Sequence, residues 1–392
     1  MRHVYLDYSA TTPVKEEVAQ EMIPYLTEKF GNPSSLYGPG LEVKEGLNQA
    51  RKQVADLIGA QEREIFFTSC GTEADNWVIE GVADAFKDKG NHIITTKIEH
   101  HAILHTCQYL EKHGVEVTYL DVDEEGFVSP ADLEAAIKDN TILVSIMMVN
   151  NEVGTIQPIK ELAAIAKAHG ILFHTDTVQA LGNIPIDVND LGVDFISMSA
   201  HKIYGPKGIG ALYKRAGINI PSFVHGGAQE KKKRAGTENT SGIVGFGKAA
   251  ELAMKSLPEH AAHSDKLRRM LWDKISSSID GVTLNGPKDF TKRHPGNLNV
   301  SFDFVEGESI LLLLDACGIS VSTGSACSSE SLDTSHVLNA MGVPVVKANG
   351  AVRFTVGDFT TEEDIDYVVE NLKTIITRLR ELSPVNGMEG WE

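Results

Sequence analysis

The first two thirds of the chain alternate between strand-like and helix-like segments, and this alternation restricts the fold more than any other feature. Strand-like runs at 63–69, 92–96 and 115–120 are each followed by a stretch with the helical spacing of apolar residues. The run TILVSIMMV at 141–149 is almost continuously apolar, as expected for a strand that is buried on both faces. Strands that alternate with helices pair in parallel, so the pattern predicts an α/β fold with a mainly parallel sheet.

The last third of the chain has a different pattern. Short strand-like segments such as NLNVSFDF and AVRFTVG lie among helices. The closing segment 361–382 places its apolar residues on one helical face. This change predicts a second, smaller α+β domain. We expect a large domain over residues 15–256 and a small domain built from residues 1–14 and 257–392.

Charge and hydropathy argue against several classes of partner. The 392 residues carry a formal net charge of −18, which disfavours contact with the phosphate backbone of nucleic acids. No apolar run is long enough to span a bilayer. The opening MRHVYLDYSATTP lacks the apolar core of a signal peptide. We therefore expect neither nucleic acid nor membrane as a partner, and we expect the protein in the cytoplasm.

Three segments carry residue types that point to chemistry. Asp176 ends the predicted strand ILFHTD, and ligands gather at the carboxyl ends of strands in open α/β sheets. Lys202 follows another predicted strand, and a lysine in a sheet crevice can lose its charge and act as a nucleophile. Gly71 and Thr72 lie where a strand turns into a helix, and free N–H groups at a helix N-terminus suit a phosphate.

Each of these segments has a plainer explanation when it is taken alone. Asp176 could cap a helix, Lys202 could be a solvated loop lysine, and Gly-Thr is common at strand–helix turns. The turn at Gly71 matches neither GxxxxGK[ST] nor GxGxxG. Together, however, they supply an amine that can trap an aldehyde, an acid that can pair with a pyridinium nitrogen, and a phosphate seat. Those are the groups that pyridoxal 5′-phosphate requires.

A fourth segment, STGSACSSES at 322–331, holds Cys327 among small and hydroxyl side chains. A structural cysteine usually packs against apolar neighbours, so this thiol is predicted to be exposed and reactive. The other three cysteines, Cys70, Cys107 and Cys317, are expected to pack, although Cys70 adjoins the proposed phosphate seat and could be reactive. No CxxC pair supports a zinc or redox-pair site, and free thiols persist in a reducing cytoplasm.

These segments are part of a longer likeness. The chain resembles the cysteine desulfurases of the NifS/IscS type, within the class V aminotransferase-like group. The resemblance covers nearly the whole chain and is carried by YLDYSATTP, FGNPSS, TSCGTEADN, NNEVGTIQP, HTDTVQALG, SAHKIYGPKGIGALY, RAGTEN, EGESILLLLD, STGSACSS and RFTVGDFTTEED. It implies the aspartate aminotransferase-like fold of pyridoxal-phosphate-dependent transferases. That fold has a large domain around a mainly parallel seven-stranded sheet, and a small α+β domain carrying the cysteine loop at about 322–335.

The resemblance also implies how the cofactor is held. Lys202 would carry the cofactor on its amine and later move a proton. Asp176 would pair with the pyridine nitrogen, Gln179 would bond the phenolic oxygen, and His100 would stack on the ring and move protons. The resemblance places the phosphate against Gly71, Thr72, Ser199 and His201, with Thr237 reaching it from a second subunit.

The resemblance further implies the substrate and the reaction. Asn151, which also contacts the cofactor, and Arg353 would hold the carboxylate of L-cysteine, an ion that suits an arginine fork. Cys327 would attack the sulfur of a cysteine–cofactor adduct, become a persulfide and leave L-alanine as the second product. The reactive form is the thiolate, and His100 is the expected source of help. No intrinsic metal is expected, although Cys327 could be a transient iron–sulfur ligand.

The partners implied are L-cysteine, a second copy of the chain in a homodimer, and a sulfur-acceptor or iron–sulfur scaffold protein. Asp358 stands where many relatives have an arginine, which leaves the chemistry intact but leaves open which acceptor takes the sulfur. His101 and His105 have a spacing that zinc can use, but no third ligand accompanies them. The basic run at 231–234 is expected to be a solvated loop, with Arg234 as a candidate contact to the phosphate or the subunit interface.

Three rival functions remain open at this point. A selenocysteine lyase and an aminotransferase would share the fold. A transaminase would not need Cys327, and a lyase selective for selenium would ignore L-cysteine. A non-catalytic scaffold would keep the fold, bind partners through its loops, and show no cofactor absorbance after reconstitution.

Overall fold

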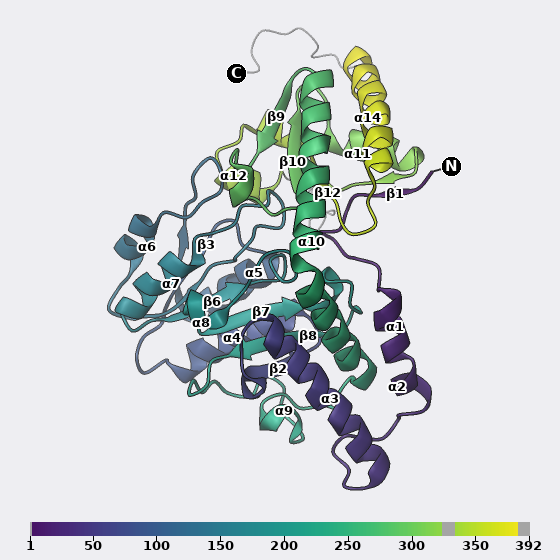
Figure 1. The fold of residues 1–392 in the computed structure, drawn as a ribbon. Helices are drawn as coiled ribbons and strands as arrows, with labels where there is room; N and C mark the ends of the chain where they lie inside the picture. Colours follow the sequence, from purple (N-terminus) through teal and green to yellow (C-terminus); the bar gives the residue numbers. More distant parts are fainter. Residues whose placement is uncertain (1, 324–333, 383–392) are drawn as a thin grey trace.

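The structure is a computed structural model that describes residues 2–323 and 334–382. Figure 1 shows a larger body built around an extended sheet and a smaller body above it. The long helix α10 (Thr240–Ser278) runs from one body into the other. The predicted boundary between residues 256 and 257 falls inside this helix, so the division of the chain by residue number stays a prediction.

The larger body contains a seven-stranded sheet in the order β2–β8–β7–β6–β5–β3–β4. All neighbouring strands are parallel except β8, which is antiparallel to both β2 and β7. The mainly parallel seven-stranded sheet expected from the sequence is therefore confirmed. The strands are β2 (Ile65–Thr68), β3 (His92–Thr96), β4 (Glu116–Leu120), β5 (Thr141–Ser145), β6 (Leu172–Asp176), β7 (Phe195–Ser199) and β8 (Gly210–Lys214).

One strand is shorter than its apolar run. The strand predicted at 141–149 pairs with β6 only as far as Ser145. The next residues stay beside β6, because the amide of Met148 donates to the carbonyl of Asp176 at 2.9 Å, but they leave the regular ladder. These residues are apolar because they are buried, although they do not belong to the regular strand. The pattern of apolar residues therefore did not show where the strand ends.

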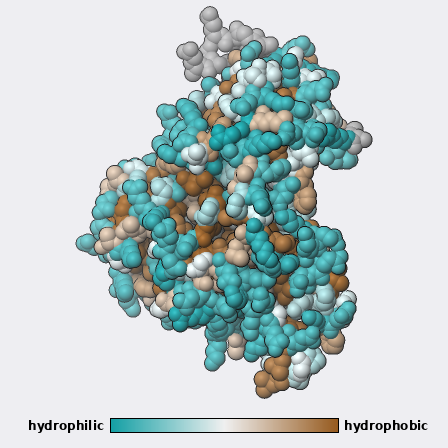
Figure 2. All heavy atoms as spheres, in the orientation of Figure 1, coloured by the Kyte–Doolittle hydropathy of each residue, from teal (hydrophilic) through white to brown (hydrophobic). Residues whose placement is uncertain are grey.

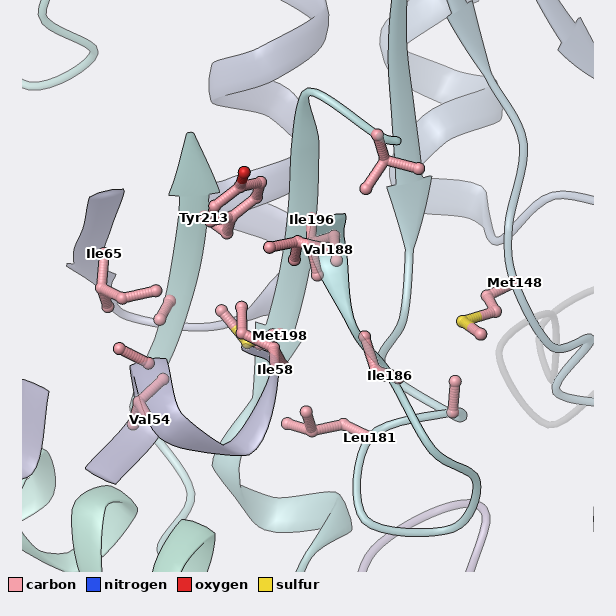
Figure 3. Close-up of a cluster of buried hydrophobic side chains, with 14 of the residues drawn as sticks. Val54, Ile58, Ile65, Met148, Leu181, Ile186, Val188, Ile196, Met198 and Tyr213 are labelled. Carbon is pink, nitrogen blue, oxygen red and sulfur yellow. The ribbon is translucent and has the colours of Figure 1, made fainter. Parts of the chain in front are cut away.

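Helices cover both faces of this sheet. Successive strand residues point to opposite faces, so Phe67 and Ile196 lie in one core while Phe66 and Phe195 lie in the other. Figure 3 shows part of the first core, where Val54 and Ile58 at the end of α3 lie near strand residues Ile196, Met198 and Tyr213. The helices are α1 (Glu16–Met22), α2 (Pro24–Thr27), α3 (Gly38–Leu57), α4 (Gly71–Ala85), α5 (His101–Glu111), α6 (Pro130–Ala136), α7 (Ile159–Ala168), α8 (Val188–Leu191) and α9 (Gln229–Lys232), with the 3₁₀ helices η1 (Glu62–Glu64) and η2 (Ala200–Lys202).

The smaller body is a three-stranded antiparallel sheet in the order β12–β10–β9, packed against helices. The N-terminal strand β1 pairs in parallel with β11, so the start of the chain packs with its last third. The elements are β1 (Val4–Tyr5), β9 (Val282–Asn285), η3 (Phe290–Lys292), β10 (Asn297–Phe302), α11 (Gly307–Ala316), β11 (Ile319–Ser320), α12 (His336–Ala340), α13 (Val345–Asn349), β12 (Ala351–Thr355) and α14 (Glu362–Leu382).

The surface is mostly hydrophilic, with a local exception. Figure 2 shows apolar atoms at the lower tip of the molecule, where α3 begins in Figure 1. Side chains between α2 and the first turns of α3 are exposed there, including Phe30 at 79%, Leu36 at 90% and Tyr37 at 62%. None of the described helices is long and apolar enough to cross a membrane.

Candidate active site

A cavity of about 290 Å³ lies at the carboxyl ends of the central strands, where β6 ends at Asp176 and β7 leads into η2. Ten of the twelve predicted site residues line it, although they are spread along the sequence. These are Gly71, Thr72, His100, Asn151, Asp176, Gln179, Ser199, His201, Lys202 and Arg353. The remaining lining residues are Ser9, Ala10, Cys70, Asp75, Met147, Val149 and Val178.

The first turn of α4 forms one wall of the cavity. Cys70 precedes the helix in an extended conformation, and its side chain makes no capping hydrogen bond within the described structure. A Cβ on Gly71 would lie 2.7 Å from Cγ2 of Val178, so only glycine allows these segments to approach so closely. N–H groups of an uncapped first turn can bind an anion such as phosphate.

Asp176 is buried at the end of β6. Burial raises the pKa of its carboxyl to about 6, although the Val178 amide and Lys202 both favour the charged form. The Val178 N–H donates to Oδ1 of Asp176 at 2.8 Å. A buried carboxylate in this environment is best stabilised by a nearby cation, and a pyridinium nitrogen is one.

Lys202 ends η2 and faces the N-terminal segment of the chain. Its amine donates to the backbone carbonyl of Ser9 and, at 2.8 Å, to that of Ala10. The side-chain amide of Gln179 donates to the same Ser9 carbonyl at 3.0 Å. Sequence reasoning missed Ser9 and Ala10, because they act here through backbone carbonyls, which leave no side-chain signal.

Two histidines in the cavity wall are neutral. Burial and the charge of Lys202 lower the pKa of His100 to about 4 and that of His201 to about 4. Nδ1 of His100 accepts the N–H of Ala102 at 3.1 Å, so the proton of the neutral ring is on Nε2. His201 is oriented by Thr11, whose hydroxyl lies 3.1 Å from its Nδ1.

Arg353 on β12 brings a cation to the cavity from the smaller body. Nη1 donates to the carbonyl of Asn151 at 2.9 Å, and Nη2 donates to Oδ1 of Asp7 at 2.8 Å. Nε is buried without a hydrogen-bond partner among the described residues. A buried, unpaired guanidinium donor is costly, so this atom indicates that the site binds an acceptor such as a carboxylate.

One predicted site residue of the described part of the chain does not line this cavity. Thr237 is exposed and lines a separate pocket with Arg234 and Glu230. Cys327 lies outside the described residues. The residues that flank 324–333 lie close to the site. On one flank, the backbone amide of Arg353 donates to the backbone carbonyl of Ser322 at 2.6 Å. On the other flank, the Ser335 hydroxyl donates to Oε2 of Glu152 at 2.5 Å.

The histidines and cysteines that the sequence analysis did not assign to the site lie in different environments. His101 and His105 stack with ring centroids 4.8 Å apart. Within residues 2–323 and 334–382, no group of three histidine, cysteine, aspartate or glutamate side chains could hold a metal ion. Cys107 is buried in the core between α4, α5 and the sheet, and burial raises its pKa to about 12. Cys70 lines the cavity, although a packing role was predicted for it.

Residues 4–368 match the class V aminotransferase family, and the chain therefore belongs to that family. Members of the family use pyridoxal 5′-phosphate, and the Gly71 turn, Asp176, Lys202 and the unpaired donor of Arg353 fit this cofactor and an amino-acid substrate. The predicted family, fold class and cofactor are thereby confirmed.

The chain is particularly similar to proteins named cysteine desulfurase IscS. It is 58% identical over 384 residues to one from Clostridium botulinum, covering 98% of this chain and 97% of that protein. It is 55% identical over 386 residues to one from Methanosarcina thermophila, covering 98% and 95%. A solved structure of a NifS-like protein is 42% identical, with a TM-score of 0.91 and coverage of 96% of this chain and 100% of that chain.

Proposed function

We propose that this chain is a pyridoxal-phosphate-dependent cysteine desulfurase. It removes sulfur from L-cysteine, releases L-alanine and carries the sulfur as a persulfide on Cys327 to an acceptor or scaffold protein of iron–sulfur cluster assembly. The observation that carries this proposal is the convergence of Lys202, Asp176 and the Gly71–Thr72 turn on one cavity. Similarity at 58% identity to a protein named cysteine desulfurase supports the choice of reaction.

The residues of the cavity divide the work of holding the cofactor. Lys202 would hold it through the amine, and Asp176 would present a carboxylate to the ring nitrogen. Gln179 would bond the ring oxygen, while the first turn of α4, Ser199 and His201 would supply donors to the phosphate. When bound, pyridoxal 5′-phosphate supplies an aldehyde that condenses with amines and a ring that withdraws electrons from the substrate.

Asn151 and Arg353 orient the substrate. The turn that carries Asn151 is rigid, because Oδ1 of Asn150 accepts the N–H groups of Glu152 and Val153, both at 2.9 Å. Arg353 is fixed to this turn through the Asn151 carbonyl. Its buried Nε then serves the substrate carboxylate, which sets the direction in which the substrate sulfur points.

Proton movement falls to Lys202 and His100. The Lys202 amine is held by two carbonyls, and His100 keeps a proton at Nε2 in the same cavity wall. Cys327 attacks the substrate sulfur as a thiolate and a new S–S bond forms. The carbon–sulfur bond breaks with its electron pair on carbon, which takes up a proton and leaves as part of alanine.

The proposal includes a homodimer in the cytoplasm. Thr237 lies outside the cavity of its own chain, as expected if it serves the cavity of a second copy. The exposed apolar side chains between α2 and α3 offer a surface for such a contact. The cytoplasmic location is the sequence-based expectation and stays a prediction.

The test is the release of alanine and sulfide from L-cysteine with a reductant, with wild type, Cys327→Ala and Cys317→Ala compared. We expect equal amounts of both products from wild type and Cys317→Ala, and near-complete loss from Cys327→Ala. An active Cys327→Ala enzyme would instead indicate a direct lyase. A wild type that binds the cofactor but transfers only the amino group would indicate a transaminase.

A further inference from the structure

Asp75 is a second buried acid in the wall of the cavity. It lies in α4, one turn after Gly71, and only 1% of its surface is exposed to solvent. It lines the same cavity as Asp176, yet it has no role among the residues assigned so far. Two buried carboxyl groups in one wall cannot both carry a full negative charge at low cost.

The partners of Asp75 are weak ones. Oδ1 has no hydrogen-bond partner among the described residues. The nearest cationic candidate is Nε2 of His174, which lies 3.7 Å away, beyond hydrogen-bond distance. His174 is itself neutral, because burial lowers its pKa to about 3. Its ring contacts the hydroxyls of Ser145 at 2.8 Å and Ser197 at 3.0 Å.

The charged groups around Asp75 also favour its neutral form. Burial raises the pKa of Asp75 well above its usual value. Repulsion by Asp176, and by Glu99 and Cys70 whenever these groups are ionised, raises it further. Only the Ser197 side chain favours the charged form. Asp176, in contrast, has the Val178 amide and Lys202 to support its charge. Of the two acids, Asp176 is therefore the one that ionises.

Ser197 connects Asp75 to Asp176. Ser197 lies opposite Asp176 in the pairing of β6 with β7. The carbonyl of Ser197 accepts the N–H of Thr177 at 3.1 Å and the hydroxyl of Thr177 at 2.9 Å. A side chain that supports Ser197 thus also fixes the backbone on which Asp176 is presented.

We propose that Asp75 is a positioning residue: a buried, protonated carboxylic acid that lies against Ser197 and leaves Asp176 as the single charged acid of the pair. The proposal rests on the proposed function only in assigning Asp176 to the cofactor nitrogen. A protonated Asp75 neither competes with Asp176 for the ring nitrogen nor repels its charge.

The first test uses the apo-protein and needs no cofactor. If Asp75 is protonated in the folded state, the fold binds a proton that the unfolded chain has lost above about pH 4, so stability falls as the pH rises. Asp75→Asn has no proton to lose at this position, so it does not lose this part of its stability as the pH rises. We expect its melting temperature, relative to wild type, to rise steadily between pH 5 and pH 8. A constant difference over that range would overturn the proposal. Asp84→Asn, on the exposed face of the same helix, serves as control.

The second test uses the holoenzyme, through the pH titration of the cofactor absorbance band and the cofactor dissociation constant. We expect Asp75→Asn, a neutral isostere, to keep the wild-type titration midpoint. Asp75→Leu should bind the cofactor about 10-fold more weakly, because Ser197 loses its polar neighbour. A midpoint shifted by about one pH unit in Asp75→Asn would mean that Asp75 is charged, and wild-type affinity in Asp75→Leu would remove its positioning role. A wild type that binds no cofactor would refute the proposed function, while the apo-protein test would still decide the state of Asp75.

Discussion

At the scale of single residues, the cavity is governed by burial acting on charged groups. Burial raises the pKa of Asp176 to about 6 and lowers that of His100 to about 4, so both shifts favour neutral side chains. Asp176 is charged above pH 6 because Lys202 and the Val178 amide support it. At neutral pH, the neutral ring of His100 therefore offers a hydrogen-bond donor, while the charged carboxylate of Asp176 offers a counter-ion.

Arg353 gives a prediction at the same scale. Arg353→Lys removes the planar guanidinium, so a single ammonium would have to serve Asn151, Asp7 and the substrate carboxylate. We expect KM for L-cysteine to rise about 10-fold to 100-fold, with a smaller change in kcat, in steady-state assays of alanine release. An unchanged KM would show that the carboxylate binds elsewhere. Arg269→Lys, on the partly exposed side of α10, is the control.

At the scale of elements, the turn at α9 has an unusual backbone. Glu230, Lys231 and Lys232 have positive φ values of 43°, 59° and 66°, a conformation that residues other than glycine rarely adopt. The buried carboxylate of Glu230 holds this turn through two bonds of 2.7 Å from Arg51 and one of 3.0 Å from the Phe67 amide. This turn leads to Thr237, the residue proposed to serve a second subunit.

The strain in this turn can be measured. Lys232→Gly relieves an unfavourable φ on an exposed side chain, so we expect it to increase the free energy of unfolding by about 1 kcal/mol in chemical denaturation. Lys44→Gly, within the exposed face of α3, should decrease it by about 1 kcal/mol. Destabilisation by both substitutions would mean that the turn is not strained in solution.

At the scale of the whole molecule, a partly buried ion cluster joins the two bodies. Asp358, just after β12, lies 2.5 Å from Nζ of Lys15 and also pairs with His260 of α10. The backbone amide of Asp358 donates to the hydroxyl of Tyr204 at 2.7 Å. Tyr204 lies two residues beyond Lys202 in the sequence. Although burial alone would raise the pKa of Asp358, His260 and Lys15 hold it at about 2.

Asp358 also stands where many relatives have arginine, and this departure can be tested. Asp358→Arg would face Lys15 with a like charge and would lose the contact with His260, so we expect a loss of about 2 kcal/mol in the free energy of unfolding at pH 7. The double variant with Lys15→Glu should recover part of the loss, while Asp366→Arg on the exposed side of α14 should cost about 0.5 kcal/mol or less. Because the folded-state pKa of Asp358 is lowered, the advantage of wild type over Asp358→Asn should vanish as the pH falls from about 4 to 2. Equal unfolding of Asp358→Arg and wild type would refute the role of this cluster.

The sequence by itself determined the local elements and the chemical residue types. The strand predicted at 92–96 is β3. Asp176 ends its predicted strand, and Lys202 follows the strand that was expected to present it. Periodicity, caps and turns are properties of neighbouring residues, so they can be read without the fold. The resemblance then supplied roles for ten residues that line one cavity.

Only the tertiary structure decided which groups meet. The carbonyls of Ser9 and Ala10 reach Lys202 across more than 190 positions, and Asp7 pairs with Arg353 across 346. Asp75 lies in an ordinary helix pattern and becomes notable only when its buried carboxyl is found beside the wall that holds Asp176. Burial and charge pairing depend on the packing of distant segments, and these set the pKa values that the chemistry needs. A local pattern contains no information on such packing.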